Sequence, residues 1–153
     1  MKVVLQRVAH ASVKVDGETV GAIGRGVLLL VGIEKGDAEA ALDALAERVA
    51  LLRIFQDDEG RMNRSLVDIG GEALVVSQFT LCADLRKGRR PSFDAAEDPA
   101  RARDMVERFR RALEARGLRT ASGRFGAEMK VELLNDGPVT FLLEPRTSAA
   151  PPS

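Results

Sequence analysis

The chain has 153 residues, of which 45% are hydrophobic and 30% are charged, a length and composition typical of one globular domain with a packed core. Lysine plus arginine and aspartate plus glutamate both number 23. The whole molecule therefore has no net field that would attract or repel a polyanion, and any nucleic-acid contact must come from a local patch. The single cysteine, Cys82, excludes an internal disulfide and cannot by itself form a cysteine-based zinc site.

The chain begins with segments that predict strands. Val3 and Leu5, and again Val13 and Val15, are interpreted as the apolar positions of alternating strands, and Asp16-Gly17 is a turn signal typical of a hairpin. Gly24-Arg25-Gly26 then breaks the chain before the apolar run 27–33, which suits a strand buried on both faces. No segment has the uninterrupted apolar run of a signal peptide or a membrane span, so we expect a soluble, cytoplasmic protein with no membrane partner.

A helix and a further strand follow. Asp37 is interpreted as an N-cap, and apolar residues recur at helical spacing from Ala41 to Leu52, which predicts an amphipathic helix over 38–55. Gly70-Gly71 marks a turn before the apolar strand 73–77.

The second half begins with a loop over 84–98. Asp98-Pro99 is typical of an N-cap followed by proline at the first helical position, and it predicts a second helix up to Gly117. Two strand-like stretches then lie on either side of Asn135-Asp136-Gly137-Pro138. The helix should bury Met105, Phe109, Ala112 and Leu113.

These elements predict an α+β fold of mixed, mostly antiparallel sheets with two main helices. A single domain should span residues 1–146, and residues 147–153 should form a frayed tail. The apolar strand surface exceeds what two helices can cover. We therefore expect barrel-like packing that is completed in a homodimer.

The usual catalytic sets are missing from the sequence. The only histidine, His10, lies in a predicted strand, and no G-x-S-x-G or H-E-x-x-H motif occurs, so we interpret His10 as structural. Cys82 is interpreted as a small buried hydrophobe, because no histidine lies near it in sequence to activate it. No glycine-rich phosphate loop or Walker lysine is present, which disfavours nucleotide hydrolysis. We expect neither a metal nor an organic cofactor.

Two segments place polar groups where a cleft can form. Ser77-Gln78-Phe79-Thr80 follows a buried strand, so that its hydroxyls, its amide and its N–H groups can face a cleft. The pattern alone nevertheless favours an ordinary strand end. The pattern of 135–140, which reads NDGPVT, favours a type I or II turn between two strands.

A basic loop lies six positions beyond Thr80. Four cations fall within five residues there, and both a solvated loop and a phosphate-binding patch remain open as interpretations. The cations are Arg86, Lys87, Arg89 and Arg90.

Taken together, these motifs resemble those of the D-aminoacyl-tRNA deacylase family, also called D-tyrosyl-tRNA(Tyr) deacylases. Its two signatures, SQFTL and NxGPVT, stand intact at 77–81 and 135–140. The resemblance covers essentially the whole chain except the tail. It extends to QRV at 6–8, MNRSL at 62–66, GRRPSF at 88–93 and FGAEM at 125–129.

The resemblance implies a proofreading hydrolase that binds tRNA, needs no cofactor and works as a homodimer with active sites at the subunit interface. A cis Gly137-Pro138 pair would reach from one subunit into the other's site and act as a chirality filter. Asn135, Val139, Thr140 and Met129 would support the site. The catalytic segment would comprise Ser77, Gln78, Phe79 and Thr80, and the basic loop would contact tRNA phosphates.

The implied chemistry is physically sensible. An aminoacyl ester is already activated, so fixed backbone N–H donors around Phe79 and Thr80, together with the substrate's own 2′-hydroxyl, can suffice. If the main chain of Gly137-Pro138 leaves no space on one side of the α-carbon, an L side chain collides while a D side chain, or none, does not. Glycyl-tRNA is then a second expected substrate. The alternative is a noncatalytic dimer that binds RNA or protein.

Overall fold

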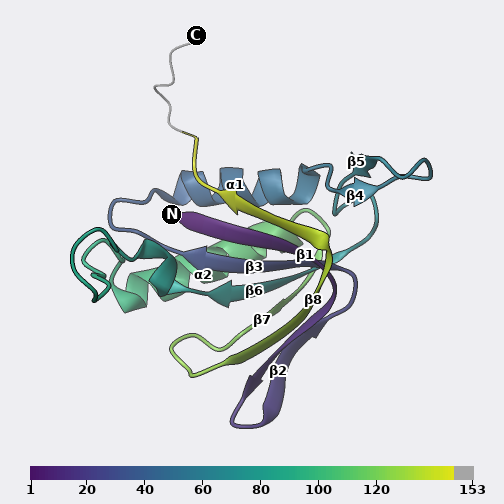
Figure 1. The fold of residues 1–153 in the computed structure, drawn as a ribbon. Helices are drawn as coiled ribbons and strands as arrows, with labels where there is room; N and C mark the ends of the chain where they lie inside the picture. Colours follow the sequence, from purple (N-terminus) through teal and green to yellow (C-terminus); the bar gives the residue numbers. More distant parts are fainter. Residues whose placement is uncertain (147–153) are drawn as a thin grey trace.

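One long strand organises the main sheet of the computed structural model, which describes residues 1–146. In that part of the chain six strands form a mixed sheet in which β1 pairs antiparallel with β2, β3 and β8, while β3–β6 and β6–β7 are parallel (Figure 1). A separate hairpin joins β4 to β5. The strands are β1 (Lys2–Val15), β2 (Glu18–Ile23), β3 (Gly26–Gly32), β4 (Phe55–Gln56), β5 (Met62–Arg64), β6 (Glu72–Ser77), β7 (Arg119–Ser122) and β8 (Lys130–Leu143).

The sheet curls until its two edges meet. β2 and β7 lie at opposite ends of the strand order, yet they contact each other and nearly close a barrel. A Cβ atom at Gly21 would lie 2.4 Å from the main-chain oxygen of Ser122, so the edges approach this closely only because residue 21 is glycine. The predicted α+β fold of mixed sheets with two helices is confirmed. Its completion in a homodimer stays a prediction.

The second helix begins as the sequence predicts. α2 (Pro99–Glu114) has Asp98 at its N-cap, and the Asp98 carboxylate accepts a hydrogen bond from the N–H of Ala100 at 3.2 Å. The helix ends three residues before Gly117. Its apolar stripe packs into the core, where Met105, Phe109 and Leu113 are buried and Ala112 is half-buried.

The first helix differs from its prediction at both ends. α1 runs over Glu39–Leu51, and its N-cap is Ala38, which makes no side-chain cap bond. Asp37 is not the N-cap, because its carboxylate instead accepts from the N–H of Glu34 at 2.6 Å and from the amino group of Met1. The predicted extension to Phe55 is also wrong, since Phe55 is buried in the β4–β5 hairpin. No helix within residues 1–146 is long and apolar enough to cross a membrane.

The predicted turn at 135–138 is wrong as well. These residues lie inside the continuous strand β8, which pairs with β1 on both sides of them. Val8 faces Asn135 while Gln6 faces Thr140, so β8 holds three more residues than β1 over this stretch. The extra residues form a bulge in β8. Residues 147–153, the predicted tail, lie outside the described residues.

Candidate functional site

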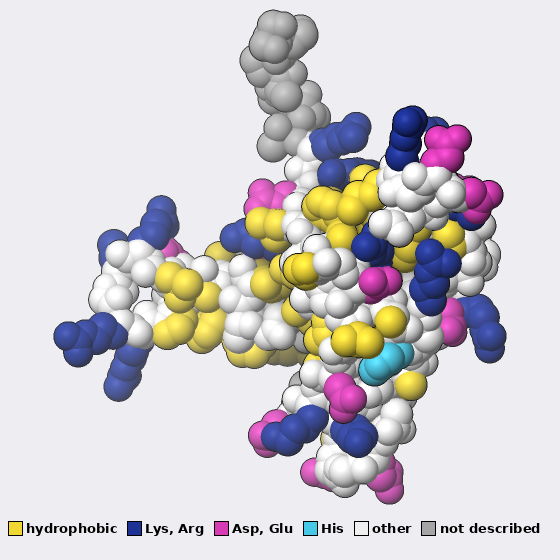
Figure 2. Space-filling view, turned by 45° about the vertical axis from the view of Figure 1, so that its right-hand side comes forward, with side chains coloured by type: hydrophobic (Ala, Val, Ile, Leu, Met, Phe, Trp, Pro, Cys, Tyr) yellow, Lys and Arg dark blue, Asp and Glu magenta, His cyan; other side chains and the backbone are white. Residues whose placement is uncertain are grey.

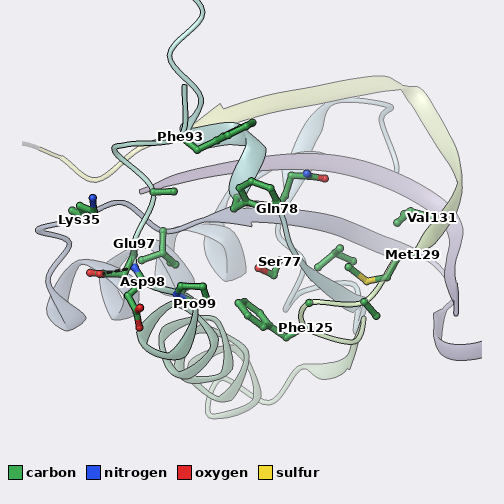
Figure 3. A pocket seen from close by; sticks show the side chains of 17 residues that line it. Lys35, Ser77, Gln78, Phe93, Glu97, Asp98, Pro99, Phe125, Met129 and Val131 are labelled. Carbon is green, nitrogen blue, oxygen red and sulfur yellow. Dashed lines mark hydrogen bonds between the residues drawn. The ribbon is translucent and has the colours of Figure 1, made fainter. Parts of the chain in front are cut away.

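A pocket of about 790 Å³ opens where β6 ends (Figure 3). Ser77 is the last residue of β6, and the predicted segment 77–79 forms one wall of the pocket. Phe125 and Met129 from the β7–β8 connection face it, and Arg103 of α2 lies over the Phe125 ring at 5.4 Å. The remaining walls come from the β3–α1 turn and from the start of α2, with Lys35, Phe93, Ala96, Glu97, Asp98 and Pro99 among them.

Tight packing against β3 fixes the turn that follows Ser77. The N–H of Gln78 donates to the carbonyl of Val31 at 2.8 Å, and residues Phe79–Cys82 form a 3-10 helix. A Cβ atom at Gly32 would lie 2.9 Å from the carbonyl oxygen of Gln78 and 3.0 Å from the Cys82 sulfur. Glycine at position 32 therefore lets the turn lie against the end of β3. No local pattern in the sequence indicates this role of Gly32.

Cys82 is buried under the same turn. Its thiol donates to the carbonyl of Ile33 at 3.4 Å, and burial raises the pKa of the thiol. The prediction of a small buried hydrophobe is confirmed. His10 lies within β1 as predicted, but its side chain is exposed, and it pairs with Leu134 in β8 rather than lining the pocket (Figure 2).

Thr80 has no base beside it among the described residues. Its hydroxyl is exposed and accepts a hydrogen bond from the side-chain amide of Gln78. A carboxamide does not take a proton from a hydroxyl near neutral pH in either orientation. Phe79 and Thr80 are the first residues of the 3-10 helix, where N–H groups have no acceptor in a preceding helical turn. Within residues 1–146 no cluster of metal-ligating side chains is present.

Gly137 and Pro138 form the exposed tip of the β8 bulge, and the peptide bond between them is cis, as the resemblance implies. The side chain of Asn135 spans the tip, since its oxygen accepts from the N–H of Val139 at 2.8 Å and its nitrogen donates to the Thr140 hydroxyl at 3.1 Å. Val139 is buried and anchors the bulge. The predicted supporting residues 135, 139 and 140 thus lie together, whereas Met129 lies in the pocket.

Arg7, which the sequence analysis did not select as a site residue, holds the bulge from beneath. Only 7% of this side chain is exposed. Its Nε donates to the carbonyl of Asp136 at 2.8 Å, and its Nη1 donates to the carbonyl of Ile54 at 2.7 Å. The guanidinium therefore connects the bulge to the segment between α1 and β4.

The bulge and the pocket do not meet within one chain. In the sheet Arg7 pairs with Val27, which pairs with Ala73, whereas the first residue of β6 that lines the pocket is Val76. Three residues of strand span about 10 Å. Accordingly, neither Gly137 nor Pro138 lines the pocket.

Two main-chain hydrogen bonds between Asp84 and Ser92, of 2.7 and 3.0 Å, hold the two ends of the basic loop together. Arg86 forms an ion pair with Asp84 and lowers the pKa of that carboxyl to about 2. Within the described chain, no carboxylate lies within ion-pair distance of the other three cations, Lys87, Arg89 and Arg90, and all of them are exposed. Figure 2 shows dark blue side chains at the outer end of the arm on its left.

Comparisons with known proteins find a matching family and similar proteins. Residues 4–144 match the protein family described as D-Tyr-tRNA(Tyr) deacylase. The chain is 60% identical over 144 residues to a D-aminoacyl-tRNA deacylase of Roseiflexus castenholzii, covering 94% of this chain and 92% of the relative. It is 53% identical over 150 residues to one of Geobacter sulfurreducens, covering 98% and 99%.

Two solved structures share the fold. One is described as a c-Myc DNA unwinding element binding protein, with a TM-score of 0.89 and 40% identity over 96% of this chain and 100% of that one. The other is described as a probable eukaryotic D-amino acid tRNA deacylase, with a TM-score of 0.79 over 93% and 97%. At 21% identity, this second likeness concerns the fold alone.

Proposed function

Since the chain belongs to the D-Tyr-tRNA(Tyr) deacylase family, we propose that it proofreads translation by admitting D-aminoacyl and glycyl esters of tRNA and excluding L-aminoacyl esters. The coarser activity follows from the family: the chain is a hydrolase that acts on D-aminoacyl-tRNA. In this proposal the pocket carries out the hydrolysis and the bulge selects the chirality of the amino acid.

The pocket holds the ester and stabilises the charge that develops on its carbonyl oxygen. In this proposal Ser77 and Gln78 shape the wall, and the backbone N–H groups of Phe79 and Thr80 donate to the oxyanion. The ribose 2′-hydroxyl of the substrate helps to activate the attacking water. The single hydrogen bond from Gln78 to the Thr80 hydroxyl supports this assignment, because it gives Thr80 no group that would activate it as a nucleophile.

The bulge acts as the chirality filter. Gly137 and Pro138 are exposed at a tip that Arg7 and Asn135 hold in place. A main-chain surface held this rigidly can occupy one side of the substrate's α-carbon and exclude an L side chain without contacting a D side chain. Glycine has no side chain to exclude, so its ester is also hydrolysed. The rigid exposed tip is the observation that carries this proposal.

The bulge of one chain acts on the substrate that is bound in the pocket of a second copy of the chain. The bulge is separated from its own pocket by about 10 Å of strand, so one chain alone does not assemble the site. Exposed apolar side chains of β8 flank the bulge in sequence and provide apolar surface for a second chain. These side chains are Leu134, Phe141 and Leu142, exposed by 54%, 39% and 60%.

The basic loop supplies the contact with tRNA. Lys87, Arg89 and Arg90 are exposed without ion pairs in the described chain, so they are available to phosphates, and Arg86 contributes in spite of its bond to Asp84. The loop returns directly to the pocket through Phe93. Phosphate contacts there would place the esterified end of the tRNA over the pocket.

One experiment separates this proposal from a noncatalytic binding dimer. Purified protein is incubated with D-aminoacyl-tRNA, the released amino acid is measured, and the mass in solution is determined by light scattering. The proposal predicts hydrolysis and about twice the chain mass of 16.5 kDa. Binding of tRNA without release of the amino acid would instead support the binding dimer.

A further inference from the structure

A pair of packed aromatic rings stands at the rim of the pocket, and the proposed chemistry does not use either side chain. The ring centroids of Phe79 and Phe93 lie 5.0 Å apart, and the ring planes are inclined by 60°. Phe79 is 57% exposed and Phe93 is 38% exposed. Large aromatic side chains that share an exposed site next to a cavity are typical of a binding surface.

The aromatic pair is continuous with the basic loop. Phe93 directly follows Ser92, the residue that closes the loop against Asp84, and Arg89 and Arg90 lie four and three positions before Phe93. Figure 3 shows Phe93 on the side of the pocket away from Phe125. Exposed cations and exposed aromatic rings thus lie along one path that leads into the pocket.

The size of the pocket limits what it can hold. Cavities of 300–1,000 Å³ enclose ligands of about the size of a small drug, so 790 Å³ suits one aminoacyl nucleoside. With that nucleoside inside the pocket, the nucleotide that precedes the esterified adenosine is placed at the rim. Proteins that hold unpaired strands combine a cationic path for the phosphates with aromatic rings on which the bases stack.

Building on the proposed tRNA substrate, we propose that the Phe79–Phe93 pair binds the base of the unpaired nucleotide immediately 5′ to the esterified adenosine. Arg89 and Arg90 contact the phosphates that flank this nucleotide. The subsite gives affinity without reading the base, because every base has a face that can stack. It lowers KM for the polynucleotide substrate and takes no part in the chemical step.

The first test changes the substrate and leaves the protein intact. Initial rates are measured with three D-aminoacyl esters: adenosine alone, the dinucleotide CpA, and the same dinucleotide with an abasic first position. The cytosine base should lower KM about tenfold relative to the abasic dinucleotide, with little change in kcat. Equal KM values for the two dinucleotides would overturn the subsite while leaving the deacylase function standing. Absence of hydrolysis of all three esters and of D-aminoacyl-tRNA measured alongside them would contradict the function itself, and the subsite with it.

The second test changes the ring. Phe93→Leu should abolish the tenfold difference between the two dinucleotides, whereas Phe93→Trp should keep it. Leu85→Ala, in the same loop and at a side chain that is 70% exposed, is the matched control and should also keep it. Persistence of the difference in Phe93→Leu would overturn the proposal. A lower mass of Phe93→Leu in light scattering would overturn it too, because the ring would then belong to a contact between copies of the chain.

Discussion

The Nε atom of Arg7 donates a hydrogen bond to the carbonyl of Asp136 at 2.8 Å, immediately before the exposed Gly137-Pro138 tip. The same guanidinium donates to the carbonyl of Ile54 at 2.7 Å. The guanidinium reaches these two carbonyls from two different nitrogens held in a fixed plane, whereas a lysine has all its donors on one nitrogen and does not reproduce this spacing. Arg7 is therefore a positioning residue whose loss should loosen the filter without touching the pocket.

Arg7→Lys should lower the free energy of unfolding by about 1–3 kcal/mol, because one buried carbonyl loses its donor. It should also lower the ratio of the rate of D-ester hydrolysis to the rate of L-ester hydrolysis. Denaturant titration and paired rate measurements check both effects. Arg48→Lys is the control, since Arg48 also donates to a main-chain carbonyl, that of Glu144, but at the surface. A lower stability with an unchanged ratio would restrict Arg7 to a role in the fold.

Gly32→Ala should impair the pocket by displacing the turn that carries Gln78. The new methyl group would lie 2.9 Å from the carbonyl oxygen of Gln78, so the turn must move by a few tenths of an ångström. Because a misplacement of about 1 Å can lower a rate by about 10²-fold, we expect this smaller shift to lower kcat by about tenfold. Gly24→Ala, before the other end of β3, meets only a side-chain oxygen at 3.3 Å and is the control. Equal kcat values in the two variants would refute this role.

Replacing Lys87 and Arg89 by alanine should weaken binding for every tRNA tested. Each lost phosphate contact should make the log–log dependence of affinity on salt shallower by about 0.7–0.9. Arg61→Ala removes a cation that is 80% exposed in the β4–β5 hairpin and should leave the slope unchanged. An unaltered slope in the double variant would mean that these cations contact solvent and not tRNA phosphates.

The locally encoded parts of the fold could be predicted from the sequence. Asp98-Pro99 begins α2, and Asp16-Gly17 closes the β1–β2 hairpin, because caps and turns depend on a few adjacent residues. The turn at 135–138 was predicted wrongly because Gly-Pro usually ends a strand. Here both halves of β8 pair with the same long strand, β1, and the intervening residues bulge instead.

The candidate site was predictable only where the family motifs mark it. The roles of Arg7 and Gly32 depend on contacts with residues 129 and 46 positions away in sequence. No periodicity or spacing shows such contacts. The exposure of the Phe79–Phe93 pair likewise emerges only when the loop folds back over the pocket.

Thr80→Ala should keep most of the single-turnover rate, because an unassisted threonine hydroxyl is a weak nucleophile. A tRNA whose terminal adenosine lacks the 2′-hydroxyl should instead lose activity by about 10²–10⁴, the usual scale for general acid–base help. Both rates are measured with enzyme in excess. A covalent aminoacyl adduct on Thr80, or near-complete loss of rate in a folded Thr80→Ala, would make the protein a nucleophilic hydrolase.

The most direct test of the account compares one tRNA charged with a D-amino acid, its L-enantiomer or glycine, using the natural chain and Gly137→Ala. The natural chain should hydrolyse the D-aminoacyl and glycyl esters and spare the L ester by about a hundredfold or more, or about 2.8 kcal/mol at 1.4 kcal/mol per factor of ten. At Gly137, where φ is +147°, a Cβ atom would lie 2.7 Å from the Val139 side chain and 2.9 Å from its nitrogen. The variant should therefore distort the tip and lose D-ester hydrolysis. Equal rates on D and L esters by the natural chain, or full activity and full selectivity in Gly137→Ala, would contradict the account.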